Sequence, residues 1–204
     1  MPEQKSETGL RDKVLLSLMY ATGTRAQEIC DLTVKSINFR TSGTTIDIVG
    51  KGAKARRIRI PDHCASMLKK YMKHRRIETE PDRHIFSSQT HEHMTISCVE
   101  EIYKKYIKLA KEKAPELFKE EHYSPHSMRH TTRQHMLEAG VPLVVIKSFL
   151  GYASVQTTQI YAESPQATVD KHVREWNEKN FPRAIYIDET DPEKSNIPDF
   201  FKGR

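Results

Sequence analysis

SPHSMRHTTRQHMLEAGVPLVVIKSFLGYASVQTTQIY, residues 124–161, holds two helical patterns that are separated by a glycine. Ser124 is a favourable N-cap and Pro125 a favourable first helical residue, so the first helix has a defined start. Gly140 ends this helix, and a second apolar helix follows and ends at Gly151. The stretch therefore predicts two consecutive helices and then a polar segment.

Chemically active residue types lie at both ends of this stretch. His126 and Arg129 fall on one helix face, and His130 follows four residues after His126. The zinc-peptidase pattern HExxH needs a glutamate after its first histidine, and Ser127 excludes it. Two helices joined by a short glycine turn are also typical of a DNA-reading helix-turn-helix. Tyr161 on its own is most simply interpreted as a capped surface aromatic.

Composition limits the class of protein. The 204 residues are 37% hydrophobic and 29% charged, which favours a soluble globular chain that forms one domain. No run of 18 apolar residues predicts a membrane span, and the polar start predicts no signal peptide. Three cysteines without CxxC spacing favour reduced thiols in a cytoplasmic protein. The net charge of +6 weakly favours a polyanionic partner.

An arginine occupies an electrostatically unfavourable position upstream. An apolar helix ends at Gly23, and Thr24 is expected to cap the next helix in a capping box with Gln27. Arg25 then lies in the first helical turn, where a positive charge opposes the helix dipole. It is either an ordinary surface residue or one that reaches toward an anion, braced by Glu28.

A small antiparallel sheet follows, with strands expected at 37–39, 45–49 and 55–60. Its tip, GKGAK, joins two strands, so it is not a phosphate-binding loop that leads from a strand into a helix. Five of the nine residues from 51 to 59 are basic and none is acidic: Lys51, Lys54, Arg56, Arg57 and Arg59. This run is interpreted equally well as a solvated hairpin face or as a basic finger in a nucleic-acid groove.

Further helices are predicted in the remaining chain: packing helices near 62–75 and 95–113, and a helix that contains Trp176. The fold class is therefore α+β, mostly α-helical with a small three-stranded antiparallel sheet. His91 and His93 lack a suitably spaced third ligand, so no metal site is predicted.

Four segments occur in order: YATGTRAQEICDL, VGKGAKARRIRIP, SPHSMRHTTRQHML and LGYASVQTTQIY. Together they closely resemble the catalytic domain of the tyrosine recombinases, the family of phage integrases, Xer-type recombinases and conjugative-transposon integrases. The resemblance covers roughly residues 9–174. It implies a polar lead-in at 1–8, a catalytic domain at 9–181, and a tail at 182–204 that docks onto a neighbouring protomer or folds back on its own domain.

The resemblance also implies a role for each motif residue. Arg25 and Arg129 are expected to hold the non-bridging oxygens of the scissile phosphate, and His126 to assist them. Lys51 is expected to be the general acid, and Tyr161 the nucleophile that forms a 3′-phosphotyrosyl link to DNA. The implied activity is site-specific DNA recombination, without a metal or a nucleotide cofactor. A pure DNA-binding module and a type IB topoisomerase-like enzyme are the alternatives.

Further expectations concern the support of this site and its partners. Glu28 and His130 match supporting positions, and the expected DNA contacts are Lys54, Arg56, Arg57 and Arg59. The expected partners are double-stranded DNA and further copies of the chain, in a tetramer on synapsed DNA, with no membrane. Tyr152 departs from the family, which usually has His or Trp there, although its hydroxyl can also donate a hydrogen bond. The family usually carries an N-terminal DNA-clamping domain, so this sequence is expected to be either an excised catalytic domain or a single-domain relative.

Overall fold

The structure is a computed structural model, and it describes residues 6–50, 55–88, 91–152 and 166–180. It is mostly helical with one three-stranded antiparallel sheet in the order β1-β2-β3, which confirms the predicted fold class. The helices are α1 (Glu7–Thr22), α2 (Ala26–Cys30), α3 (Asp62–Arg75), α4 (Ile96–Lys113), α5 (Pro125–Glu138), α6 (Leu143–Leu150) and α7 (Gln166–Asn180). The strands are β1 (Ile37–Asn38), β2 (Thr45–Val49) and β3 (Ala55–Arg59).

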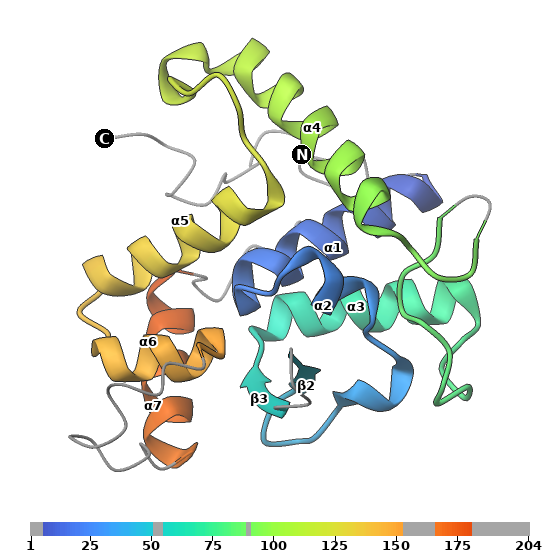
Figure 1. The fold of residues 1–204 in the computed structure, drawn as a ribbon. Helices are drawn as coiled ribbons and strands as arrows, with labels where there is room; N and C mark the ends of the chain where they lie inside the picture. The colour runs from blue at the N-terminus through green and yellow to red at the C-terminus, as the bar shows by residue number, and fades with distance from the viewer. Residues whose placement is uncertain (1–5, 51–54, 89–90, 153–165, 181–204) are drawn as a thin grey trace, which may run out of the picture.

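Helix α1 is the central helix of the fold. It packs against both α3 and α5, and Figure 1 shows α5, α6 and α7 gathered on one side of the molecule. Its residues Val14, Leu15 and Leu18 are completely buried. The Ser6 side chain accepts a hydrogen bond from Gly9 N at the start of α1, and Gly23 ends the helix with a left-handed φ of 57°.

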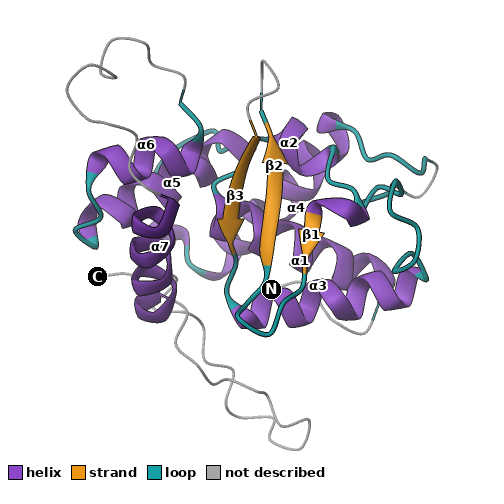
Figure 2. Ribbon diagram, turned by 90° about the horizontal axis from the view of Figure 1, so that it is seen from below, coloured by secondary structure: helices purple, strands orange, loops and turns teal. Residues whose placement is uncertain are grey.

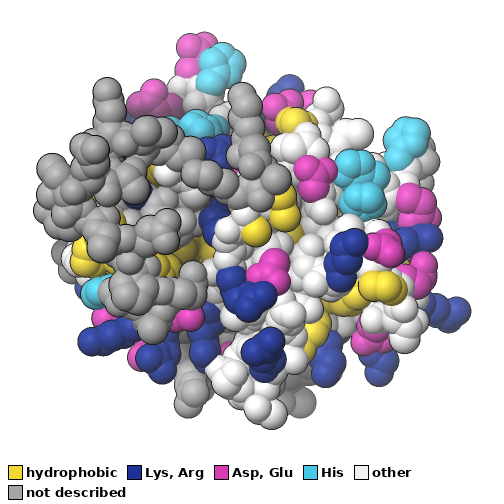
Figure 3. All heavy atoms as spheres, turned by 60° about the horizontal axis from the view of Figure 1, so that its bottom comes forward, with side chains coloured by type: hydrophobic (Ala, Val, Ile, Leu, Met, Phe, Trp, Pro, Cys, Tyr) yellow, Lys and Arg dark blue, Asp and Glu magenta, His cyan; other side chains and the backbone are white. Residues whose placement is uncertain are grey.

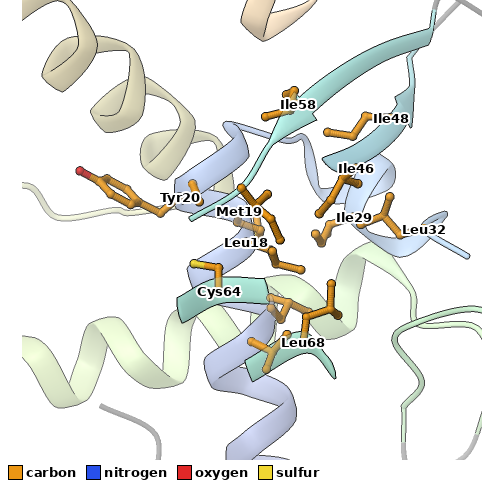
Figure 4. Close-up of a cluster of buried hydrophobic side chains, with 14 of the residues drawn as sticks. Leu18, Met19, Tyr20, Ile29, Leu32, Ile46, Ile48, Ile58, Cys64 and Leu68 are labelled. Carbon is orange, nitrogen blue, oxygen red and sulfur yellow. The ribbon is translucent and has the colours of Figure 1, made fainter. Parts of the chain in front are cut away.

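The sheet contributes one apolar face to the core. Ile46 on β2 pairs in register with Ile58 on β3, and both are buried with Ile48. Figure 4 shows these isoleucines near Leu18 and Ile29 of the first two helices. Figure 2 shows the helices behind the strands, so the alternation along β2 and β3 leaves polar side chains on the other face.

The predicted pair of helices in the C-terminal half is confirmed. α5 begins at Pro125 after the N-cap Ser124, and α6 ends at Gly151, whose φ is 68°. α7 closes this side of the core, because the buried Trp176 lies 6.3 Å from the Phe149 ring and 6.0 Å from that of Tyr20, measured between ring centroids.

Two expected helix starts are wrong by one to a few residues. α2 has Arg25 as its N-cap, and Glu28 rather than Gln27 accepts the hydrogen bond from the cap backbone, at 2.8 Å. Thr24 does not cap the helix because it is buried in the turn, where its hydroxyl accepts a hydrogen bond from Thr22. α1 begins at Glu7, so two residues of the expected lead-in are helical.

No helix in the described residues combines the length and the apolar character that a membrane span requires.

The buried face of β2 gives a direct stability test. We expect Ile46→Ala to lower the free energy of unfolding by about 2–5 kcal/mol, because a fully buried side chain is replaced by a cavity. Val49→Ala on the same strand removes a side chain that is 60% exposed, and its effect should stay within about 0.5 kcal/mol. Urea unfolding of both variants measures the difference, and equal losses would contradict this account of the sheet.

Candidate active site

Arg129, in the second turn of α5, is the most buried charged group of the site. Only 2% of the residue is exposed. Its Nη1 donates to the carbonyl of Gly23, and its Nη2 donates to the carbonyl of Leu150 at 2.6 Å. These carbonyls belong to the ends of α1 and α6. Since a guanidinium has five N–H groups, two fix Arg129 to the backbone and three remain for other acceptors.

The charge of Arg129 is poorly compensated. Burial lowers its pKa, and the nearby positive charge of Arg25 lowers it further. Within the described residues no carboxylate forms an ion pair with Arg129, and its buried Nε has no hydrogen-bond partner there. An arginine stays protonated at neutral pH, so this arrangement favours an anion that binds next to it.

Tyr152 lies against the same guanidinium. Its ring centroid is 5.0 Å from Arg129 Cζ, in a cation–π arrangement, while 40% of the residue remains exposed. The left-handed Gly151 reverses the chain after α6, and Tyr152 N donates to the carbonyl of Lys147. The helix end therefore determines where the tyrosine lies.

Arg25 shares a buried carboxylate with a second arginine. Its Nη1 lies 3.0 Å from Glu28 Oε1, and Arg56 makes a two-pronged contact with the same carboxylate at 3.0 and 2.7 Å. Burial is the largest influence on the pKa of Glu28 and raises it, but hydrogen bonds and charges from Arg56 and Arg25 outweigh it and the pKa is lowered. Glu28 is therefore ionised, and the expected brace on Arg25 is present.

His126 and His130 lie edge to face, with ring centroids 4.6 Å apart. Burial lowers the pKa of His126, and the neighbouring His130, Arg129 and Arg25 lower it further. His126 is thus a neutral imidazole at pH 7, and one of its ring nitrogens can donate a hydrogen bond.

A cleft of about 300 Å³ is lined by both Arg25 and Arg129. It lies between α2, α4 and α5, and its lining includes Arg25, Gln27, Ile96, Glu100, His126 and Arg129. Three residues expected at the phosphate, Arg25, His126 and Arg129, therefore share one cleft. Lys51, Lys54 and Tyr161 lie outside the described residues.

Two features of the site have no counterpart in the expectations. α4 supplies Ile96 and Glu100 to the cleft, yet its helical pattern indicated only packing. Arg56 contacts Glu28 from a strand that is 28 residues away in sequence, and no local pattern predicts such a pair.

The basic residues of the hairpin do not form a uniform surface. Arg57 is paired with Asp47 at 2.6 and 2.9 Å. The Arg59 side chain lies against Gly43, at the end of the sheet opposite the Val49–Ala55 pair. On the face of the molecule drawn in Figure 3, Lys and Arg side chains are interspersed with Asp and Glu over the described part. The assignment of these residues to DNA contact stays a prediction.

The depressed pKa of His126 can be measured by NMR titration of its imidazole. We expect a value below the ordinary 6.5, and a higher value in His130→Asn, because this variant removes the imidazole whose electrostatic influence lowers the pKa of His126. Since the unfolded chain takes up this proton more readily, the contribution of His126 to stability is lost as pH falls from 6.5 through the lower pKa of the folded chain. An unchanged titration in His130→Asn would contradict this electrostatic account.

Comparisons with known proteins identify the family. Residues 2–167 match the model of the phage integrase family. The tyrosine recombinase XerA of Pyrococcus furiosus is 34% identical over 167 residues, which cover 81% of this chain and 53% of XerA. A crystal structure of XerA recombinase has a TM-score of 0.59 at 27% identity and covers 87% of this chain and 59% of that one.

A second solved structure supports the fold. XerH site-specific recombinase, in a pre-cleavage complex with its difH substrate, has a TM-score of 0.63 at 23% identity and covers 81% of this chain and 46% of that one. The chain spans about half the length of the curated relatives it matches. Because the family match extends over most of its residues, the chain belongs to the phage integrase family.

Proposed function

We propose that this chain is the catalytic part of a site-specific DNA recombinase, which cleaves and rejoins DNA through a 3′-phosphotyrosine link at Tyr161. The observation that carries the proposal is the cleft in which Arg25 and Arg129 from separate helix starts meet His126. Related proteins named tyrosine recombinases, and a related recombinase solved with its DNA substrate, support the same reaction class.

The two arginines have different tasks at the scissile phosphate. Arg129 is held by two backbone carbonyls, so its position is fixed before DNA binds and it retains further Nη N–H groups for the phosphate. Arg25 is more exposed, with 40% of its side chain accessible, and approaches from α2. Guanidinium forks match pairs of phosphate oxygens and neutralise the negative charge that grows in the transition state.

His126 and Tyr152 complete the contacts to the phosphate. A phosphate anion raises the pKa of a neighbouring histidine, so His126 becomes a stronger hydrogen-bond donor as DNA binds. Tyr152 extends over Arg129, and its hydroxyl is a further donor in the position where relatives usually carry His or Trp. His130 supports His126 through its edge-to-face contact.

The covalent steps use Tyr161 and Lys51. The phenolic oxygen of Tyr161 attacks phosphorus and gives its proton to solvent water, while the bond from phosphorus to the 5′ oxygen breaks. Lys51 gives a proton to that leaving oxygen. One phosphodiester is exchanged for another, so a 5′ hydroxyl of DNA can reverse the step without a nucleotide cofactor.

The proposed partner is double-stranded DNA, with Lys54, Arg57 and Arg59 as backbone contacts. We also assign residues 9–181 to the catalytic domain and propose a tetramer on synapsed DNA in which residues 182–204 dock onto a neighbour. Because the match covers only about half of each relative, further DNA contacts are expected from parts that this chain does not span.

The decisive test uses a set of overlapping DNA duplexes that together cover the DNA flanking the gene. Each duplex carries a nick, so that the short fragment released by cleavage diffuses away and the covalent complex is trapped. We expect a covalent protein–DNA band on a denaturing gel, and its complete loss in Tyr161→Phe. Tyr152→Phe keeps the ring over Arg129 and is expected to weaken the band without abolishing it.

The alternatives give different results in the same assay. The absence of a covalent band on every duplex that the chain binds would contradict the proposal and favour a DNA-binding module. Relaxation of supercoiled plasmid without strand exchange would favour the topoisomerase-like activity.

A further inference from the structure

We propose that Arg56 is a positioning residue that keeps Arg25 available to the scissile phosphate, and that it is not a DNA contact. The inference rests on the proposed function, because it concerns how the same site is assembled. It departs from the expectation that Arg56 contacts DNA together with Lys54, Arg57 and Arg59.

The low exposure of Arg56 separates it from Arg57, the next residue on the strand. Only 11% of its side chain is accessible, whereas 52% of the Arg57 side chain is. Both nitrogens at the end of Arg56 are bonded to the Glu28 carboxylate, which is itself 5% accessible. A phosphate cannot take these donors without displacing a buried carboxylate, and that would leave a desolvated charge without its main partner.

Arg56 controls how Arg25 uses the shared carboxylate. The Arg25 side chain donates only to Oε1 of Glu28. The other oxygen, Oε2, already accepts hydrogen bonds from Arg56 Nη2 and from the backbone N–H of Arg25. The other N–H groups of Arg25 therefore remain available in the cleft. Without Arg56, the Arg25 fork can close on both oxygens of Glu28, and these donors are then lost to the phosphate.

Arg56 also lies against the end of α6. A Cβ added to Gly151 would come within 3.0 Å of Arg56 Nη1, so the guanidinium packs directly on this turn. The preceding residue, Leu150, supplies the carbonyl that accepts from Arg129 Nη2. One side chain on β3 thus contacts the carboxylate that holds Arg25 and the turn that holds Arg129.

A pair of substrates distinguishes positioning from general damage. One duplex carries the normal scissile phosphate, and the other carries a neutral methylphosphonate at the same place. The neutral methylphosphonate develops less negative charge in the transition state than a phosphate, so its cleavage depends less on a correctly placed cation. A substitution that acts through Arg25 should therefore lower the cleavage rate less on the methylphosphonate than on the normal phosphate. We compare Arg56→Gln, the charge-conserving Arg56→Lys, Arg25→Gln and the matched control Arg57→Gln.

We expect Arg56→Gln to slow formation of the Tyr161-linked complex on the normal phosphate by about 10- to 100-fold, since small displacements of a catalytic group have effects of this size. The loss should be much smaller on the methylphosphonate, as for Arg25→Gln, and Arg56→Lys should recover part of the rate. Arg57→Gln should weaken DNA binding and its salt dependence, but keep the ratio of the two rates found in the unaltered chain.

The inference is overturned if Arg56→Gln slows the reaction equally on the normal phosphate and on the methylphosphonate. It is also overturned if Arg56→Gln behaves like Arg57→Gln, with altered DNA affinity and salt dependence and an unchanged ratio of the two rates. Thermal unfolding checks each variant, and if Arg56→Gln does not fold, Arg56→Lys and Glu28→Gln carry the same comparison. If the unaltered chain forms no Tyr161-linked complex, the proposed function itself fails, which is a distinct result.

Discussion

The site depends on the two hydrogen bonds that Arg129 donates to the carbonyls of Gly23 and Leu150. Through them one side chain of α5 joins the end of α1 to the end of α6. Thr132, one turn further along α5, donates to the carbonyl of Tyr20 and adds a second link to α1. Helix ends have carbonyls without partners in their own helix, so the guanidinium satisfies groups that would otherwise be costly to bury. The fold and the cationic site are thus stabilised by the same contact.

Electrostatics explains why this arrangement suits an anion. Glu28 is shared by Arg25 and Arg56, and within the described residues it is the carboxylate in direct contact with the arginines of the site. Among these residues Arg129 forms no ion pair with a carboxylate, its partners are two backbone carbonyls and Tyr152, and its pKa is lowered by burial and by Arg25. The site therefore carries excess positive charge in a partly desolvated cleft. A phosphodiester supplies the missing negative charge, and most strongly when that charge increases during the reaction.

Local chemistry explains which features of the fold could be predicted. Ser124, Gly23 and Gly151 mark helix ends because capping depends on a few adjacent residues, and the structure has helix ends at all three. The cap of α2 was misassigned because Thr24 is drawn into a buried turn by Thr22, which is a tertiary effect. The grouping of Arg25, His126 and Arg129 was expected from family motifs and not from spacing. The contact of Arg56 with Glu28 joins a strand to a helix, and sequence periodicity carries no information about such a pair.

The central claim is that the two arginines of the cleft activate a phosphodiester toward Tyr161, and not toward Tyr152, whose ring already lies 5.0 Å from Arg129 Cζ. The most direct measurement is mass spectrometry of the covalent complex after nuclease and protease digestion, which identifies the residue that carries the nucleotide. The account predicts a nucleotide joined through its 3′ phosphate to Tyr161. A nucleotide on Tyr152, or one joined through its 5′ phosphate, would contradict it.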